Sequence, residues 1–283
     1  MAQLWKGAPV AAALTEQLSQ RAQALIAKGV TPTLAIVRVG ERPEDLSYER
    51  GALKRCEKVG IAVRQYLLTA TSSQTDLMEV IKEINRDDSI HGCLLFRPLP
   101  KHMDEAAVCA ALSPAKDVDG ITAGSLAAVF SGSGAGYPPC TAQACLEILD
   151  HYGYELKGKR AVVVGRSLVI GKPVSMLLLG RHATVTICHT RTADLPAECR
   201  RADVLVAAAG KAGAVSAQCL APGQVVLDVG INVDEDGNLV GDVDFAAAEN
   251  TVEAITPVPG GVGAVTTSVL ARHVIEAAEK AIG

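Results

Sequence analysis

The sequence contains few aromatic residues, no long apolar run and no excess of basic charge. Aromatic residues make up 3% of the 283 residues and hydrophobic residues 49%, so the core must consist mainly of Ala, Val, Leu and Ile. The longest apolar stretches, such as 126–130 and 204–209, are far shorter than the roughly 20 residues of a membrane span. Acidic residues outnumber basic ones by 31 to 27, which argues against a nucleic-acid-binding surface. We therefore expect a globular protein that binds neither membranes nor nucleic acids.

The eight cysteines form no Cys-x-x-Cys pair, and the first residues lack the basic segment, apolar core and cleavage site of a signal peptide. In a reducing compartment such cysteines serve as small buried hydrophobic residues. We therefore expect a cytoplasmic protein without a structural zinc or other metal site. Its length corresponds to about two domains of ordinary size, which leaves room for a cleft.

The first half of the chain alternates helical and strand patterns. Asp45 or Ser47 is a candidate cap for a helix that runs to Val59, and Gly60 is suited to its C-terminal end. We further predict helices at about 8–28 and 75–85 and strands at 34–39, 61–68 and 92–96. This alternation is typical of a parallel β-sheet with helical crossovers.

The glycine- and serine-rich segment 131–136, followed by Pro138 and Pro139, interrupts this pattern and is the candidate domain junction. After it we predict helices at 141–152 and 173–180 and strands at 160–165, 184–188, 204–208 and 225–229, the pattern of a doubly wound sheet. The last helical stretch, 266–281, is expected to return to the first domain. We therefore predict an α/β fold of two domains separated by a cleft: residues 1–140 plus 266–283, and a Rossmann-type parallel sheet within 141–265.

The segment 162–173 has the order of a buried strand, a glycine turn and a helix start. Gly165 ends the strand, and Pro173 suits the first turn of the helix, whose N-terminus can bind a phosphate. The segment departs from Gly-x-Gly-x-x-Gly because Ser167 replaces the second glycine. It indicates a dinucleotide site, with an ordinary tight strand-to-helix turn as the alternative.

The end of the next predicted strand bears on the choice of nucleotide. An acidic residue there binds the ribose hydroxyls of NAD and repels a 2′-phosphate, but the first acidic residue in this segment is Asp194. An electropositive, hydrogen-bonding corner is expected instead from His189, Thr190, Arg191 and Arg166. Arginine binds phosphate through charge-assisted hydrogen bonds, so this corner favours NADP. The alternative is a solvated surface with two ordinary arginines.

Four further segments carry more glycine, proline and polar residues than packing requires. They begin at Ser47 (Ser-Tyr-Glu-Arg-Gly-Ala-Leu-Lys), Gly92 (Gly-Cys-Leu-Leu-Phe-Arg-Pro-Leu-Pro), Lys116 (Lys-Asp-Val-Asp-Gly-Ile-Thr) and Thr256 (Thr-Pro-Val-Pro-Gly-Gly-Val-Gly). With the Gly165 turn, 228–232 (Asp-Val-Gly-Ile-Asn) and 241–243 (Gly-Asp-Val), they span nearly the whole chain. In this combination the sequence resembles the 5,10-methylenetetrahydrofolate dehydrogenase family, commonly bifunctional with methenyltetrahydrofolate cyclohydrolase.

The resemblance implies a folate site in the cleft, NADP on the second domain and a homodimeric assembly. By position, Tyr48 is expected to stack on the pterin and Asp119 to accept hydrogen bonds from its amino-pyrimidine edge, which makes these two the expected catalytic residues. The other implied substrate-binding residues are Leu99, Pro100, Pro259, Gly260 and Gly261, and the implied cofactor-binding residues are Gly165, Arg166, Ser167, Thr190 and Ile231. The chemistry agrees, since a carboxylate accepts paired N–H donors and consecutive glycines let the backbone approach a flat ligand.

Two positions depart from the family pattern that the resemblance implies. The family's tyrosine and lysine, which lie four residues apart on one helical face, correspond here to Tyr48 and Ala52. The glutamine that hydrogen-bonds this lysine in the family corresponds to Phe96. Lys54 lies two positions beyond Ala52, roughly 200° further around the helix, and so points away from the tyrosine's face. Arg55 shares the tyrosine's face, but a guanidinium cannot release a proton at physiological pH.

We therefore expect an NADP-dependent 5,10-methylenetetrahydrofolate dehydrogenase of one-carbon metabolism with little or no cyclohydrolase activity. Hydride transfer needs mainly the proximity of two rings, whereas hydrolysis of the methenyl product needs a titratable group. Two alternatives stay open: a bifunctional enzyme that makes 10-formyltetrahydrofolate, and a non-catalytic folate- or NADP-binding protein. The expected partners are tetrahydrofolate derivatives and a second copy of the chain.

Overall fold

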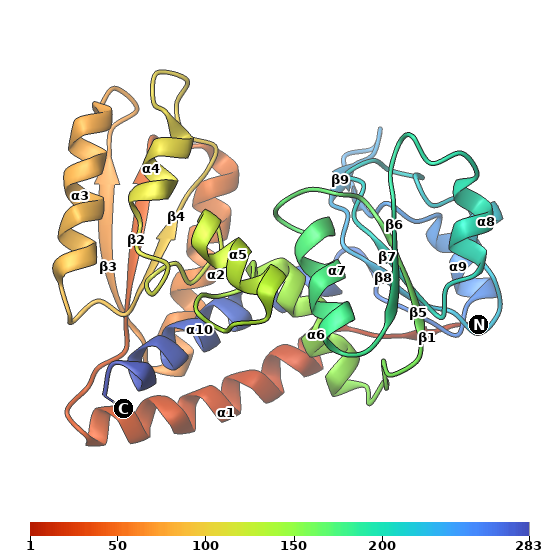
Figure 1. The fold of residues 1–283 in the computed structure, drawn as a ribbon, viewed down its shortest axis with the longest axis horizontal. Coiled ribbons are helices and arrows are strands. Elements are labelled where there is room, and N and C mark those ends of the chain that lie inside the picture. Colours follow the sequence, from red (N-terminus) through yellow and green to blue (C-terminus); the bar gives the residue numbers. More distant parts are fainter. Residues whose placement is uncertain (283) are drawn as a thin grey trace. The chain divides into compact units, whose positions relative to one another are not determined.

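The computed structural model describes residues 1–282, which form two compact α/β units (Figure 1). The first unit consists of Ala12–Cys140 and the described part of Thr267–Gly283. The second unit consists of Met1–Ala11 and Thr141–Thr266. Each unit has its own parallel sheet. The alternation of helices and strands in each half of the sequence therefore builds a separate sheet.

The first unit has a three-stranded parallel sheet in the order β3-β2-β4. Its strands are β2 (Thr33–Val39), β3 (Ala62–Leu68) and β4 (Gly92–Leu95), and its helices are most of α1 (Gly7–Ala27), α2 (Pro43–Val59), α3 (Gln74–Arg86), α4 (Glu105–Ala111), α5 (Ala123–Ser131) and nearly all of α10 (Thr266–Lys280). Every residue of β2 is buried. Ala35 and Val37 face the apolar side chains of α3 and α4, which cover one side of the sheet (Figure 1). The central strand is thus buried on both faces, as expected for a parallel sheet with helical crossovers.

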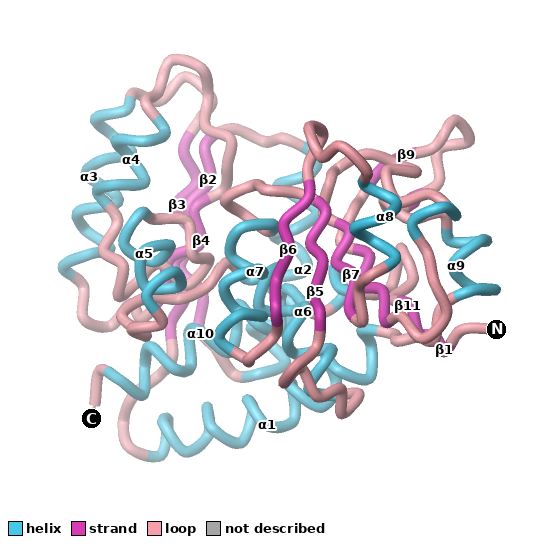
Figure 2. The backbone as a smooth tube through the Cα atoms, turned by 45° about the vertical axis from the view of Figure 1, so that its right-hand side comes forward, coloured by secondary structure: helices cyan, strands magenta, loops and turns pink. Residues whose placement is uncertain are grey.

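The second unit has a six-stranded sheet in the order β1-β11-β8-β7-β5-β6, and all of its strand pairs are parallel (Figure 2). Its strands are β1 (Gln3–Leu4), β5 (Arg160–Val164), β6 (Thr184–Cys188), β7 (Val204–Ala207), β8 (Val225–Asp228) and β11 (Ala254–Ile255), with a separate hairpin of β9 (Asn232–Val233) and β10 (Leu239–Val240). Its helices are α6 (Cys140–His151), α7 (Gly171–Gly180), α8 (Leu195–Arg200) and α9 (Phe245–Thr251), with 3₁₀ turns at Ala217–Cys219 and Val262–Ala264. This doubly wound arrangement confirms the predicted Rossmann-type sheet.

The N-terminal segment differs from the sequence-based expectation. Met1–Ala11 belong to the second unit and not with the rest of 1–140, because β1 adds to the edge of the six-stranded sheet beside β11. Such a pairing joins residues about 250 positions apart, which no local pattern signals. The start of α2 also differs: the helix begins at Pro43, ahead of both expected caps, since proline fits the first helical turn.

The division between the units lies between Cys140 and Thr141, a few residues after the glycine- and serine-rich segment 131–136. That segment follows α5, a helix absent from the sequence-based expectation, and it remains in the first unit. The reason is close packing just after it: a Cβ at Gly120 would overlap the Pro138–Pro139 backbone, and the Tyr137 ring lies 5.0 Å from the imidazole of His273.

All eight cysteines are buried and none forms a disulfide, which confirms the expectation that they serve as core residues. Among residues 1–282, no helix has the length and apolar character needed to span a membrane.

Candidate functional site

The turn after β5 has the geometry of a dinucleotide-binding turn. The order of the sheet reverses at β5, whose neighbours are β6 and β7, and ligands of such sheets bind at the carboxyl ends of the strands at this point. Gly165 has a φ of 135°, and a Cβ there would overlap the carbonyl oxygen of Ala208. A Cβ at Gly171 would likewise overlap the Gly165 carbonyl. Both glycines are therefore required to bring the strand end, the end of β7 and the start of α7 together.

Ser167, which replaces the second glycine of the common motif, stabilises this turn. Its hydroxyl oxygen accepts hydrogen bonds from the backbone N–H groups of Ile170 (3.1 Å) and Gly171 (3.4 Å). The hydroxyl proton takes no part in these two bonds and is available as a donor to a ligand. Arg166, Ser167 and the two residues after them are exposed. The Ser167 side chain thus stabilises the turn and is also exposed at its surface.

The residues after β6 are polar and are joined by local hydrogen bonds. The Nδ1 atom of His189 accepts the backbone N–H of Arg191 (3.1 Å), and the arginine side chain is exposed, as is that of Thr190. Asp194 accepts the backbone N–H of Ala197 (3.0 Å) and so caps α8. The first acidic residue after the strand is therefore engaged in helix capping.

The segments 228–232 and 241–243 are joined by two buried aspartates, neither of which the sequence singled out as a structural anchor. Asp228 accepts three backbone N–H groups at 2.9–3.1 Å, including that of Asp242. Asp242 in turn accepts the backbone N–H groups of 209–211 at 2.6–2.9 Å. Burial raises the pKa of Asp228 to about 6, and the three hydrogen bonds oppose this shift. The pair holds the loop after β7 beside the Gly165 turn.

We expect Gly165→Ala to destabilise the second unit by about 3 kcal/mol and to weaken dinucleotide binding, because the new Cβ requires both a strained φ and a displaced Ala208 carbonyl. Gly158→Ala is the matched control: Gly158 has a φ of 76°, but nothing lies within 4 Å of an added Cβ. Urea unfolding and NADP titration of both variants check this expectation. Equal losses in the two variants would show that the close approach at Ala208 is unimportant.

In the first unit, a buried ion pair positions α2 against the sheet. The Arg38 Nε atom on β2 lies 3.0 Å from the Glu49 Oε2 atom, and both side chains are 6% exposed. Gln65 on β3 donates to the other carboxylate oxygen at 2.6 Å. Because a buried charge is costly without its partner, these contacts fix the rotation of α2 at Glu49. The same contacts therefore fix the direction in which the side chain of the preceding residue, Tyr48, leaves the helix.

Tyr48 and Phe96 are brought together by the fold. Their ring centroids are 6.0 Å apart at an interplanar angle of 80°, an edge-to-face contact. Ala52, one turn further along α2, is fully buried. Lys54 is exposed, and the Arg55 guanidinium donates to the Thr15 hydroxyl on α1. The described structure therefore supplies no proton-transfer group from position 52 or 96 beside the tyrosine.

The Pro98–Pro100 loop is held by a glutamate that sequence reasoning missed. Glu105, in the first turn of α4, accepts the backbone N–H of Leu99 (2.9 Å) and lies 3.5 Å from the Arg97 guanidinium. Arg42 donates to the Arg97 carbonyl oxygen at 2.8 Å. An acidic residue in the first turn of a helix just after a proline-rich loop is a weak signal for such an anchor. Leu99 is buried at the carboxyl end of β4.

The loop 117–122, which carries Asp119, is closed by its own hydrogen bonds. The Asp117 carboxylate accepts the backbone N–H groups of Ile121 (3.0 Å) and Thr122 (2.8 Å). Gly120 has a φ of 69°, the left-handed conformation that glycine tolerates best. The loop is therefore a rigid support for the side chain between these anchors.

Burial raises the pKa of Tyr48 well above its usual value, and the charge of Asp119 adds to this shift. Burial also raises the pKa of Asp119 to about 6, while a hydrogen bond from the Cys140 thiol acts in the opposite direction. The Asp119 carboxyl group is thus a half-buried hydrogen-bond acceptor. The first unit thus brings together Tyr48, Ala52, Phe96 and Asp119.

The remaining predicted residues lie in the second unit. Pro259 and Gly260 are exposed, and the Gly260 carbonyl accepts the backbone N–H of Gly7 at 2.8 Å. Gly261 is buried, with its backbone close to Pro257. Ile231, which follows β8, is 66% exposed. Pro259, Gly260 and Ile231 are therefore exposed on the second unit, whereas Gly261 is not.

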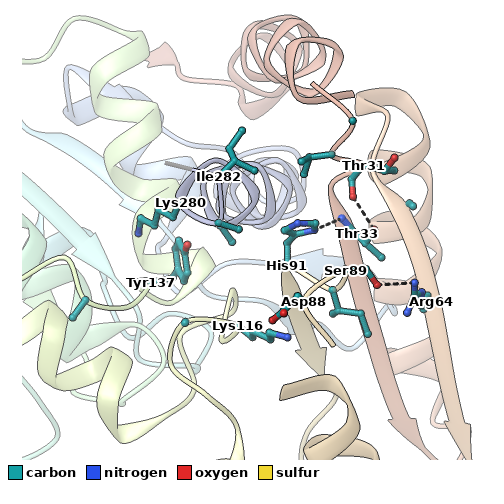
Figure 3. Close-up of a pocket in the computed structure, with 18 of the residues that line it drawn as sticks. Thr31, Thr33, Arg64, Asp88, Ser89, His91, Lys116, Tyr137, Lys280 and Ile282 are labelled. Carbon is teal, nitrogen blue, oxygen red and sulfur yellow. Dashed lines mark hydrogen bonds between the residues drawn. The ribbon is translucent and has the colours of Figure 1, made fainter. Parts of the chain in front are cut away.

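A cavity of about 1230 Å³ lies at the amino ends of the three strands of the first unit (Figure 3). His91 accepts the backbone N–H of Thr33 (3.1 Å) at its edge. Lys116 donates to two carbonyls at the end of α3, and Arg64 pairs with an aspartate there. None of the predicted site residues is among the described residues that line it. Since Phe96 follows the opposite, carboxyl end of β4, we do not assign this cavity to the candidate site.

Two family models cover most of the chain. The model described as tetrahydrofolate dehydrogenase/cyclohydrolase, catalytic domain, matches residues 5–119. The model described as tetrahydrofolate dehydrogenase/cyclohydrolase, NAD(P)-binding domain, matches residues 139–282. The turn after β5 therefore lies in an NAD(P)-binding domain.

Individual relatives match over nearly the full length. The chain is 51% identical to the bifunctional protein FolD of Clostridioides difficile over 275 residues, 97% of this chain and 96% of that protein. It is 51% identical to the bifunctional protein FolD of Carboxydothermus hydrogenoformans over 281 residues, 99% of this chain and 98% of that protein.

Solved structures agree with these matches. The crystal structure of the bifunctional enzyme FolD from Campylobacter jejuni has a TM-score of 0.96 at 36% identity and covers 99% of both chains. The Trypanosoma brucei methylenetetrahydrofolate dehydrogenase-cyclohydrolase, complexed with NADP and an inhibitor, has a TM-score of 0.92 at 33% identity and covers 99% of this chain and 98% of that one. The chain belongs to the tetrahydrofolate dehydrogenase/cyclohydrolase family.

Proposed function

We propose that this protein is an NADP-dependent 5,10-methylenetetrahydrofolate dehydrogenase with little or no cyclohydrolase activity. The observation that carries the proposal is the chemistry around Tyr48. The chain has Asp119 for binding of the folate and the Gly165 turn for binding of the dinucleotide. The side chains of Ala52 and Phe96, in contrast, offer no proton donor or acceptor. The site is therefore equipped for hydride transfer and not for acid–base catalysis.

In the proposed reaction, a hydride leaves the methylene carbon that bridges N5 and N10 of the folate, and the nitrogen lone pairs stabilise the methenyl cation that remains. Bound NADP supplies the hydride acceptor. Tyr48 presents an aromatic face to the pterin, and the Asp119 carboxylate accepts two N–H groups of the amino-pyrimidine edge. The protein contributes mainly by holding the reacting rings in proximity, a form of catalysis that needs no lysine.

The residues of the second unit fit a dinucleotide. The start of α7, directly after the Gly165 turn, favours the negative charge of a pyrophosphate. Ser167 has a hydroxyl proton to donate, while Arg166 and Arg191 are exposed where a 2′-phosphate is expected. Asp194, as the cap of α8, is engaged elsewhere. This charge pattern supports NADP over NAD.

We expect Arg191→Ala to raise the Michaelis constant for NADP about 10- to 100-fold and to leave that for NAD nearly unchanged, because one charge-assisted contact to the 2′-phosphate is lost. Arg201→Ala is the matched control, since Arg201 is an exposed arginine of the same unit that pairs with Glu198 at 3.4 Å. Steady-state kinetics with both cofactors make the comparison. Equal efficiency of the unaltered protein with NAD and NADP would contradict the proposed preference.

The proposed activity is tested by incubating the protein with 5,10-methylenetetrahydrofolate and NADP and following methenyltetrahydrofolate by its absorbance. Product formation that depends on enzyme and NADP is the expected result. Binding of both ligands without product would favour the alternative of a non-catalytic folate- and NADP-binding protein. Asp119→Ala serves as a variant that retains the dinucleotide turn.

A bifunctional dehydrogenase and cyclohydrolase that makes 10-formyltetrahydrofolate is the second candidate. The comparisons favour it over a dehydrogenase alone, because the relatives that match over nearly the whole chain are named bifunctional. The substitutions at Ala52 and Phe96 favour the dehydrogenase alone. Separate measurement of the methenyl and 10-formyl products distinguishes the two candidates.

We further propose that the protein acts in the cytoplasm as a homodimer. The eight buried, unpaired cysteines suit a reducing compartment. Sedimentation equilibrium measures the oligomeric state, and a monomer at micromolar concentration would contradict the second part of this proposal.

A further inference from the structure

The loop that carries Asp119 is held by a side chain from the C-terminal helix. His273, on α10, is 3% exposed, and its Nδ1 atom lies 2.8 Å from the carbonyl oxygen of Val118. A carbonyl oxygen can only accept a hydrogen bond, so Nδ1 carries a proton and donates it. This bond joins residues 155 positions apart, and it reaches the peptide immediately before Asp119.

A second donor acts on the same carbonyl group. The Cys140 Sγ atom lies 3.3 Å from the Val118 carbonyl oxygen, so its thiol donates to the oxygen that also accepts from His273. Asp117 closes the loop from the other side through Ile121 and Thr122. The backbone on either side of Asp119 is thus fixed, and the histidine provides the connection to α10.

The surroundings keep the imidazole neutral at physiological pH. Burial lowers the pKa of His273 to about 4; the Val118 hydrogen bond and Glu276 oppose this shift, whereas Arg272 adds to it. The Tyr137 ring lies 5.0 Å from the imidazole. A neutral ring with its proton on Nδ1 is a directional donor and not a source of charge near the aspartate.

We propose that His273 is a positioning residue for folate binding: its N–H group fixes the Val118 peptide and thereby directs the Asp119 carboxylate toward the pterin. This inference rests on the proposed function for the role of Asp119. His273 acts through the backbone, so its removal affects the folate and spares the dinucleotide. If His273 only packed against its neighbours, its replacement would lower stability without a selective loss of folate affinity.

The test compares His273→Leu with His273→Asn. Asparagine carries an N–H donor the same number of bonds from the backbone as Nδ1, whereas leucine fills space without donating. We expect His273→Leu to raise the tetrahydrofolate dissociation constant about 10- to 100-fold. The NADP dissociation constant should stay within about twofold, since distant sites act independently. His273→Asn should restore most of the folate affinity.

Val269→Ala is the control for a general loss of stability, because Val269 is fully buried on the same helix and its side chain cannot form a hydrogen bond. Amide hydrogen exchange at Ile121 and Thr122 reports the order of the loop without any ligand. We expect faster exchange in His273→Leu than in Val269→Ala.

Unchanged folate affinity or unchanged loop exchange in His273→Leu, at a melting temperature like that of Val269→Ala, would overturn the proposal and make His273 a packing residue. If the unaltered protein binds no tetrahydrofolate, the proposed function fails and the proposed role in folate binding fails with it. In that case, faster loop exchange in His273→Leu would still support the contact between His273 and the Val118 peptide, but not a role in folate binding. The two failures are therefore distinguishable.

Discussion

Methenyltetrahydrofolate is expected to accumulate when the protein oxidises 5,10-methylenetetrahydrofolate, and to decay only at the rate set by the buffer. Its hydrolysis requires water addition at the bridging carbon and delivery of a proton to a departing nitrogen, which suits a titratable group near that carbon. Ala52 has no such group, and Phe96 can neither donate nor accept a hydrogen bond. Loss of general acid–base assistance typically costs about 10²- to 10⁴-fold in rate.

The variants Ala52→Lys, Phe96→Gln and the double substitution separate the two positions. Ala52→Lys alone should recover little activity, because the site is fully buried and a lysine there has no partner from position 96 to orient it or adjust its pKa. The double variant should hydrolyse the methenyl compound fastest. Melting temperature and dehydrogenase rate control for misfolding in each variant. Enzyme-dependent hydrolysis by the unaltered protein that keeps pace with its dehydrogenase turnover would contradict the expectation and support the bifunctional candidate.

Replacement of Asp119 is expected to abolish folate binding before it affects folding. Asp119→Ala leaves two buried N–H donors of the pterin unpaired at about 1–3 kcal/mol each, which corresponds to at least about 30-fold weaker binding. Asp88→Ala is the control, since Asp88 is an exposed carboxylate of the same unit. Isothermal titration with tetrahydrofolate and thermal melting provide the two readouts. A sharp fall in melting temperature with unchanged folate affinity would instead assign Asp119 to the turn.

The raised pKa of Asp119 adds a pH dependence. Burial raises this pKa to about 6, so the carboxyl group binds a proton more readily in the folded than in the unfolded protein. Its contribution to stability is therefore present at low pH and is lost as the pH rises through about 6. Folate binding has the opposite dependence, because only the carboxylate accepts both N–H groups: affinity should fall as the pH drops below about 6. Asp119→Asn should remove this pH dependence and should melt no lower than the unaltered protein at pH 7.

The order of elements followed from the sequence because it depends on local interactions. Hydrophobic periodicity and glycine positions predicted the strands and the longer helices of the first half to within a few residues, and Gly60 ends α2 in the left-handed conformation as expected. Gly165 was recognisable for the same reason, since its turn lies within one strand–turn–helix unit. The short helices α4, α5, α8 and α9 were missed, because a helix of two turns has little periodicity to detect.

The tertiary structure decided what surrounds the predicted residues. The pairing of β1 with β11, the Asp242 bonds to 209–211 and the His273 bond to Val118 each join segments that are distant in sequence. The sequence identified Asp119 as a candidate acceptor, but only the fold places a buried histidine and a thiol against the peptide before it. Local patterns specify which backbone conformations are favourable, whereas the partners of a buried polar group depend on how distant elements pack. That packing gives Asp119 its raised pKa and its rigid support.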